Sequence, residues 1–246
     1  MGLGDWFVGA LNKIGECVCK AFAFVCDTMS KCGGLGHAIA VGVQALAVVF
    51  PPLAPIVRVA AAVIEVLTLV CTGRKTNVEE LGDKAMRAEK HRDDFPTTEQ
   101  YRDYLDNEVP FDREAFNKLS PEEQEARRFL GMEIAIEHVQ EKISLPIKPE
   151  DLFVAIRAGL TGSQLGELAK LFKELGFDSM KPLADYFNCN LDDATRAKVE
   201  GALSQVLKKE DARLDAVGVN ERLDSLDVAY KQGVAPEQMK PAVEEV

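Results

Sequence analysis

Apolar residues recur at helical spacing over residues 5–32, in steps that alternate between four and three. This spacing predicts one long helix, and two consecutive glycines after Cys32 supply its end. The charges between Lys13 and Lys31 fall on a narrow stripe, so most of the circumference is apolar. We expect such a helix to be surrounded by protein or to lie in a bilayer. Its predicted membrane or assembly contacts are Trp6, Phe7, Leu11, Ile14, Val18, Phe22 and Val25.

A stretch without any charged residue follows, over residues 32–57. Three prolines break it, because proline lacks a backbone donor and clashes with the preceding turn: Pro51, Pro52 and Pro55. The sequence therefore predicts a helical hairpin with arms at residues 35–50 and 56–72. Each arm is about 25 Å long as a helix, slightly short for a bilayer core of about 30 Å. The predicted contact positions on the arms are Ile39, Val43, Leu46, Phe50, Ile64 and Leu67.

Arg58 and Glu65 are the charged exceptions in the second arm, seven residues apart and on nearly one face. A charge facing lipid at mid-helix costs roughly 2.5–3.5 kcal/mol. One interpretation is a polar contact with another subunit or the lining of a pore. The other is a charge pair inside a protein core, between these two residues or with Lys20. The basic Arg74-Lys75 flank predicts that both ends of a membrane hairpin face the cytosol.

From residue 77 onward the pattern predicts an array of short and medium helices, with no period-two run that would indicate a strand. The predicted helices are 78–94, a short one after Thr97, a turn or two in 111–119, one from Ser120 to about 143, then 149–160, 162–175, 180–188, Asn190 to about 217, and 220–233. The expected fold class is thus all-α: an N-terminal amphipathic helix, a proline-centred hydrophobic hairpin and an acidic multi-helix array. The predicted divisions are a hydrophobic region 1–75, an acidic helical domain 76–235 and a tail 236–246.

Charge separates these parts further. Residues 1–72 carry four basic and four acidic residues, so the formal net charge of −11 belongs to residues 73–246. An acidic chain argues against a nucleic-acid partner. The N-terminus lacks the basic start of a secretory signal, and five of the six cysteines lie in apolar surroundings, which is typical of reduced thiols in an intracellular protein. S-acylation of the first cysteines is the alternative.

Candidate chemistry is sparse. The sequence has no dinucleotide, phosphate-loop, zinc-protease or nucleophile-elbow motif. His138 follows Glu137, but Ala135 stands where a di-iron helix needs glutamate, so a solvated acidic face is expected there. Residues 188–193 resemble part of a calcium loop, yet Asp193 replaces its glycine, and helix capping is the better interpretation. We therefore expect no enzyme, no catalytic residue, no cofactor and no metal.

Three functional hypotheses remain. The first is a membrane-associated or self-assembling helical protein that inserts or packs residues 1–72 and uses its acidic domain for protein contacts. The second is a pore-forming toxin or effector with a sheltered hairpin, and the third is a structural subunit of a large particle. The plain alternative to all three is a soluble globular protein with an unusually apolar N-terminal core. The expected partners are a bilayer, copies of the chain and other proteins. The expected location is intracellular and membrane-associated with both termini cytosolic, or outside the cell after export by a non-Sec route. On this interpretation, residues 76–246 fold without residues 1–75.

Overall fold

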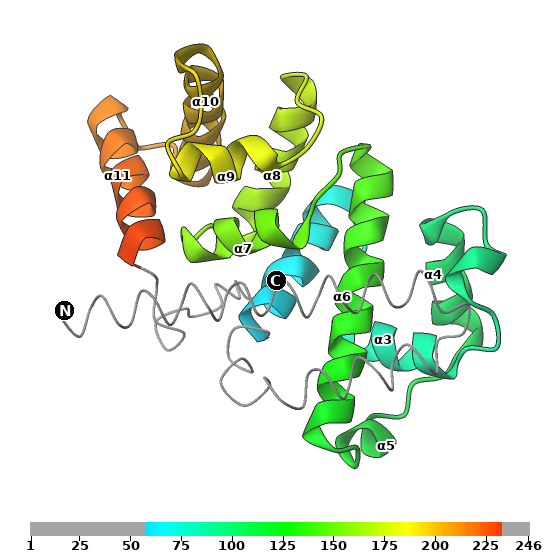
Figure 1. The fold of residues 1–246 in the computed structure, drawn as a ribbon. Coiled ribbons are helices and arrows are strands. Elements are labelled where there is room, and N and C mark those ends of the chain that lie inside the picture. The colour runs from blue at the N-terminus through cyan, green and yellow to red at the C-terminus, as the bar shows by residue number, and fades with distance from the viewer. Residues whose placement is uncertain (1–57, 233–246) are drawn as a thin grey trace.

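A computed structural model describes residues 58–232, drawn as a coloured ribbon in Figure 1. Within that range every regular element is a helix, so the all-α class is confirmed for this part of the chain. The first helix covers residues 58–72 and is called the 58–72 helix. The others are α3 (Val78–Arg87), the 3₁₀ turn η1 (Arg92–Asp94), α4 (Thr98–Glu108), α5 (Arg113–Asn117), α6 (Pro121–Ile143), α7 (Pro149–Arg157), α8 (Gly162–Glu174), α9 (Lys181–Phe187), α10 (Asp193–Glu210) and α11 (Ala216–Gln232).

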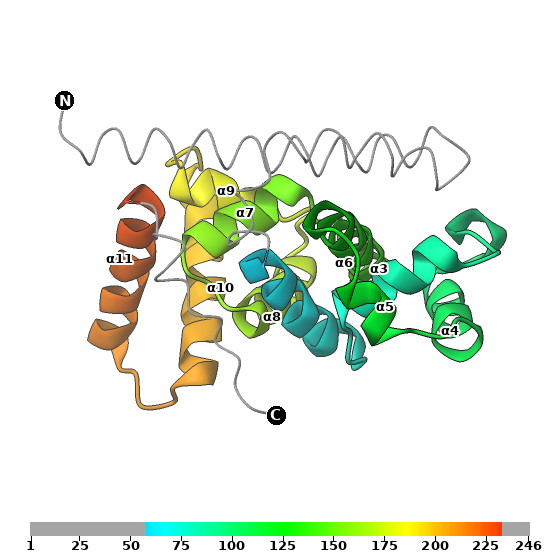
Figure 2. The same cartoon turned by 90° about the horizontal axis from the view of Figure 1, so that it is seen from below.

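The long helix α6 runs through the middle of the described fold (Figure 1). Helices α3, α4 and α5 lie on one side of it, and α7 to α11 lie on the other. In the view turned by 90°, α11 and α4 again lie at opposite ends (Figure 2). The 58–72 helix lies between the two groups, beside α6 and α8, and so helps to join them.

The helix starts at Ser120 and Thr97 follow the capping chemistry that the sequence predicts, whereas α10 and α11 start at Asp193 and Ala216 instead of at the predicted residues 190 and 220. Ser120 Oγ accepts a hydrogen bond from Glu123 N at 3.2 Å, and Glu123 Oε2 accepts one from Ser120 N at 2.9 Å. At the start of α4, Thr97 Oγ1 accepts a single bond of this kind, from Gln100 N at 3.2 Å. These bonds satisfy backbone donors that have no partner within the helix, and so they fix where each helix begins.

Several predicted boundaries are wrong by a turn or more. The helix expected over residues 78–94 ends at Arg87, and the chain then turns so that Phe95 packs against Tyr101 and Tyr104, with ring centroids 5.4 and 5.2 Å away. The helix expected to reach residue 217 ends at Glu210. Here tertiary packing and local turns override a helical pattern that continues in the sequence.

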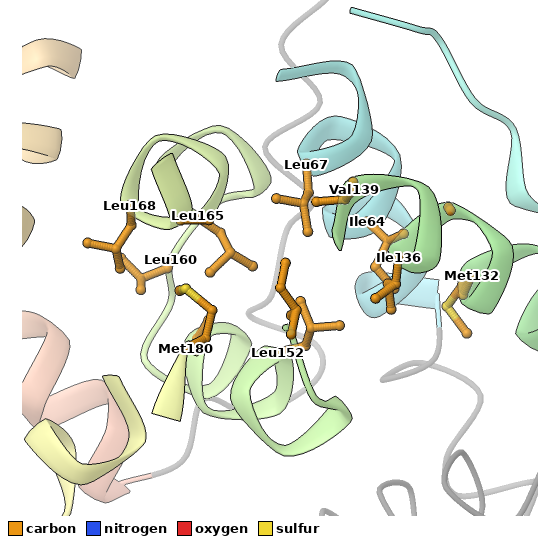
Figure 3. Close-up of a cluster of buried hydrophobic side chains, with 14 of the residues drawn as sticks. Ile64, Leu67, Met132, Ile136, Val139, Leu152, Leu160, Leu165, Leu168 and Met180 are labelled. Atoms are coloured by element: carbon orange, nitrogen blue, oxygen red, sulfur yellow. The ribbon is translucent and has the colours of Figure 1, made fainter. Parts of the chain in front are cut away.

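One hydrophobic core runs through the described residues. Figure 3 shows Ile64 and Leu67 of the 58–72 helix among side chains of α6, α7 and α8. Leu67 has no exposed surface and Ile64 is 2% exposed. The second arm of the predicted hairpin is therefore a core helix of this fold, and the core continues across the division predicted at residue 75.

Two helix crossings in this core depend on glycine. A Cβ added at Gly82 of α3 would lie 1.7 Å from Arg127 O, and one at Gly131 of α6 would lie 1.9 Å from Val78 O. The backbones of α3 and α6 are thus in direct contact at these positions. Likewise, a Cβ at Gly162 of α8 would lie 2.4 Å from the carbonyl oxygen of Val63 in the 58–72 helix.

The C-terminal end of the 58–72 helix is fixed by α8 as well. Lys170 Nζ donates to Val70 O at 2.8 Å, which places a cation where a helix exposes unpaired carbonyls. Cys71 Sγ donates to Gly166 O at 3.8 Å, and burial raises the pKa of this thiol to about 11. This cysteine accordingly stays protonated at neutral pH and acts as a packing residue.

The remaining sequence predictions fall outside the described residues. They are the amphipathic helix over 5–32, the first hairpin arm, the proline turn at residues 51–55 and the tail from residue 236. No helix within residues 58–232 is long and apolar enough to cross a membrane.

Candidate functional site

A cleft of about 420 Å³ opens beside the start of the 58–72 helix. Polar and small side chains from three helices line it: Arg58, Ala61, Ala62, Glu65, Asn77, Val78, Glu79 and Arg128. The cleft therefore brings together Arg58 and Glu65, the two charges singled out in the apolar arm. It lies where the apolar N-terminal sequence joins the described body.

Glu65 has its partner on the next helix. Its Oε1 accepts a hydrogen bond from Val78 N at 2.8 Å, while Asn77 Oδ1 accepts from Glu80 N at 2.9 Å. Two of the free donors at the start of α3 are thus satisfied, and a carboxylate at that end also interacts favourably with the helix dipole. Burial raises the pKa of Glu65, an effect that the bond from Val78 partly offsets.

Charged residues of α3 and α6 form the far wall of the cleft, and Arg113 of α5 pairs with one of them from outside the lining. Arg128 Nη2 donates to Glu79 Oε1 at 2.5 Å, and Arg113 Nη1 donates to Glu79 Oε2 at 2.9 Å. Arg128 is also paired with Glu125, one helical turn earlier in α6. Although burial raises the pKa of Glu79, the bonds from Arg128 and Arg113 have the larger combined effect and hold that pKa below its usual value.

This arrangement presents both signs of charge along one cleft. Arg58 is exposed at its edge, whereas the side chain of Arg128 is only 8% exposed. Carboxylate and guanidinium groups with partly used bonding capacity suit polar contacts with another protein segment. The sequence indicates Arg58 and Glu65, but Glu79 and Arg128 lie 14 and 63 residues beyond Glu65 and carry no local signal that would link them to it.

A second polar cluster is buried between α4 and α6. Arg102 is 1% exposed, and its Nη1 lies 2.9 Å from Nδ1 of His138, which is 2% exposed. Arg102 Nη2 donates to Thr76 Oγ1 at 2.7 Å. The prediction that His138 lies on a solvated face is wrong, because α4 covers it. The spacing of the residues in α4 could have indicated this burial. The buried face of α4 consists of residues three and four positions apart, and Arg102 is one of them: Thr98, Tyr101, Arg102 and Leu105.

The acidic segment before α10 does what the capping interpretation expects. Asp192 Oδ1 accepts from Thr195 N at 2.8 Å and so begins that helix. Within residues 58–232 no group of three or more histidine, cysteine, aspartate or glutamate side chains is placed to hold a metal ion. Comparisons of the chain with protein-family models, with curated proteins and with solved structures each find no match.

Proposed function

We propose that this protein is a non-enzymatic, membrane-associated helical protein, in which the sequence before Arg58 inserts into a bilayer and the helical body makes protein contacts. The observation that carries this proposal is the end of the apolar run. Leu67 is fully buried in a core that extends through α6 and α8, so the run is joined at one end to a folded body. Residues 32–57, which carry no charge, directly precede Arg58 in the sequence, and Arg58 lines the cleft.

We limit the proposed membrane segment to residues that precede Arg58. Ile64 and Leu67 are buried among protein side chains, so they cannot contact lipid while the fold is intact. The proposed lipid contacts are consequently the apolar residues that precede Arg58 in the sequence: Trp6, Phe7, Leu11, Ile14, Val18, Phe22, Val25, Ile39, Val43, Leu46 and Phe50. Arg58 and Glu65 then mark the polar boundary at the surface of the body.

Liposome flotation tests the proposal directly. The full chain is mixed with neutral and with anionic vesicles and floated through a density gradient, alongside a matched chain that begins at Arg58. We expect the full chain to float with both vesicle types and the shortened chain to stay at the bottom, because apolar burial requires no lipid charge. If the full chain remains at the bottom with both vesicle types, membrane association is wrong.

Self-assembly is the second candidate function. The alternating spacing of four and three over residues 5–32 is the pattern of helices that pack along a seam with copies of themselves. Light scattering of the full chain without lipid distinguishes the two. A defined oligomer that becomes a monomer when residues 1–57 are removed supports assembly, whereas a monomeric full chain contradicts it.

Pore formation, which is the toxin hypothesis, would require part of the described fold to rearrange. Glu65 would have to leave Val78 N, and the 58–72 helix would have to leave its core, before either charge could line a lumen. Release of a trapped dye from vesicles measures this activity, and vesicles that stay sealed at every pH tested would exclude it.

A further inference from the structure

The contact between α4 and α6 contains a buried cation whose bonded partners are both neutral. Arg102 keeps its charge at all ordinary pH values, and its two guanidinium contacts are His138 Nδ1 and Thr76 Oγ1. Two carboxylates interact electrostatically with Arg102 without bonding to it, those of Asp103 and Asp106, and each of them is bonded to Arg74 at 2.7 Å. A single imidazole nitrogen is therefore one of the few acceptors that this buried charge has.

This geometry determines the protonation state of His138. Every guanidinium nitrogen of Arg102 is a donor, so Nδ1 of His138 has to accept, which makes the ring neutral with its proton on Nε2. Within the described residues, neither Nε2 of His138 nor Nε of Arg102 has a hydrogen-bond partner. A second proton on the ring would remove the acceptor and leave two cations in contact inside the core.

The surrounding charges do not compensate for such a proton. Arg102 and Arg74 oppose it, while Glu99 of α4 and Glu141 of α6 favour it. Glu141 is engaged, because its Oε2 accepts from Thr98 N at 2.7 Å. Arg58 and Glu65, the charges of the 58–72 helix, lie in the cleft described above. Burial, which is the largest effect, and the neighbouring charge of Arg102 outweigh the two glutamates, so that the pKa of His138 is lowered to about 4.

We propose that Arg102 and His138 form an acid-sensitive latch that holds α4 against α6 at neutral pH and releases it when His138 takes up a proton. Release uncovers Tyr101 and Leu105, which are 1% and 0% exposed in the closed state. The device goes beyond the proposed membrane function and does not depend on it. It would let acidification expose an apolar surface on the helical body.

Hydrogen exchange on the full chain tests the latch between pH 7.5 and pH 5.0, a range in which ordinary carboxylates stay ionised. With a pKa of 6.5 in the open state and about 4 in the closed state, opening should increase about 30-fold at pH 5.0. After correction for the intrinsic exchange rate, we expect amides of α4 to lose protection by about this factor, while amides of α8 keep theirs.

His138→Gln is the decisive variant, since glutamine can still accept from Arg102 but takes up no proton in this range. We expect α4 of H138Q to keep its protection at pH 5.0, and the matched control His91→Gln to behave as the unmodified chain does. Loss of α4 protection in H138Q equal to that of the unmodified chain would overturn the latch. Should H138Q not fold, an NMR titration of His138 in the unmodified chain decides, and a native-state pKa of 6.5 or above overturns the proposal.

Discussion

Glu65 illustrates how the surroundings of one side chain set its response to pH. Its carboxylate is half-buried and accepts a bond from Val78 N, yet burial has the larger effect and raises its pKa. A carboxyl with a folded-state pKa above the unfolded one holds more protons in the folded state. When the pH falls through the interval between the folded-state and the unfolded-state pKa of Glu65, protonation of this carboxyl therefore increases the stability of the fold. Protonation of His138 has the opposite effect.

Replacing this carboxyl with an amide gives the first prediction. Glu65→Gln keeps an acceptor for Val78 N but removes the charge, so the unfavourable free energy of burying the charged carboxylate disappears. We expect E65Q to be more stable than the unmodified chain at pH 7, because burial opposes the charged carboxylate, and we expect this advantage to shrink as the pH falls. Urea unfolding at three pH values measures it. If the difference in free energy of unfolding between E65Q and the unmodified chain does not change with pH, then the charge of Glu65 is not its cause.

A matched pair of aspartates provides the second prediction. Asp83 has a side chain only 6% exposed and accepts from Arg127 Nε at 3.0 Å, and it also pairs with Arg87. Asp103 has a side chain 56% exposed and pairs with Arg74. Removing a buried partner leaves a desolvated cation, whereas an exposed pair is screened by water.

We expect Asp83→Ala to lower the free energy of unfolding by about 3 kcal/mol, and Asp103→Ala to lower it by under about 1 kcal/mol. Denaturant unfolding of both variants gives the comparison. Equal losses would mean that burial does not control the strength of these ion pairs.

At the scale of helices, the packing of α3 on α6 depends on two positions without a side chain. Gly82 and Gly131 let the two backbones touch, and this approach sets Glu79 opposite Arg128 in the cleft wall. The glycines are thus needed for the geometry of the candidate site as well as for the core. Backbone atoms cannot swing aside as the end of a flexible side chain can.

The third prediction compares two glycine-to-alanine changes within helices. Gly82→Ala places a methyl group 1.7 Å from Arg127 O, so α3 has to move away, and we expect a loss of about 3 kcal/mol of stability. Gly201→Ala in α10 meets nothing within 4 Å, so the better helix propensity of alanine should stabilise by about 0.5–1 kcal/mol. Thermal unfolding of both variants checks the opposite signs. A neutral G82A would show that the close crossing is absent in solution.

The helix starts after Ser120 and Thr97 were more predictable than the ends of α3 and α10. Ser120 and Thr97 carry their capping signal within four residues, and the structure uses both as expected. The end of α3 at Arg87 depends on where Phe95 finds its aromatic partners, which lie on α4 and are set by the tertiary fold. A local pattern cannot contain that information.

For the molecule as a whole, the informative result is that the 58–72 helix belongs to the same core as the acidic helices. Ile64 and Leu67 of the 58–72 helix pack with α6, α7 and α8 (Figure 3). The sequence predicts the existence of this helix and its buried face, but not whether the neighbours are lipid or protein. Apolar spacing is the same in both cases, and only the contacts with distant helices distinguish them.

Two truncations form the fourth prediction. A chain that begins at Arg58 retains every described core residue, and we expect it to unfold cooperatively. A chain that begins at residue 76 lacks Ile64 and Leu67, and we expect it to lose cooperative unfolding, in contrast to the independence that the charge division suggests. Circular dichroism with urea unfolding tests both. A cooperative transition in the shorter chain would show that α3 to α11 can close the core alone.

The candidate site could be predicted only in part from the sequence, for a related reason. Arg58 and Glu65 are conspicuous because they interrupt an apolar run, and the structure places both in one cleft. Arg102 and His138 are inconspicuous, since each sits in a charged stretch where a solvated position is the ordinary outcome. Their burial follows from the docking of α4 on α6, a contact between segments 36 residues apart.

The bond between Lys170 and Val70 joins residues that are 100 positions apart in the chain. At a synthesis rate of about 5–20 residues per second, the ribosome needs roughly 5–20 s to make the intervening sequence. During that time Ile64 and Leu67 have left the ribosome or are leaving it, while the α8 surface that will cover them has not yet been made. The apolar face of the 58–72 helix accordingly stays uncovered by α8 for roughly 5–20 s of synthesis, and this part of the core cannot close before α8 has been made.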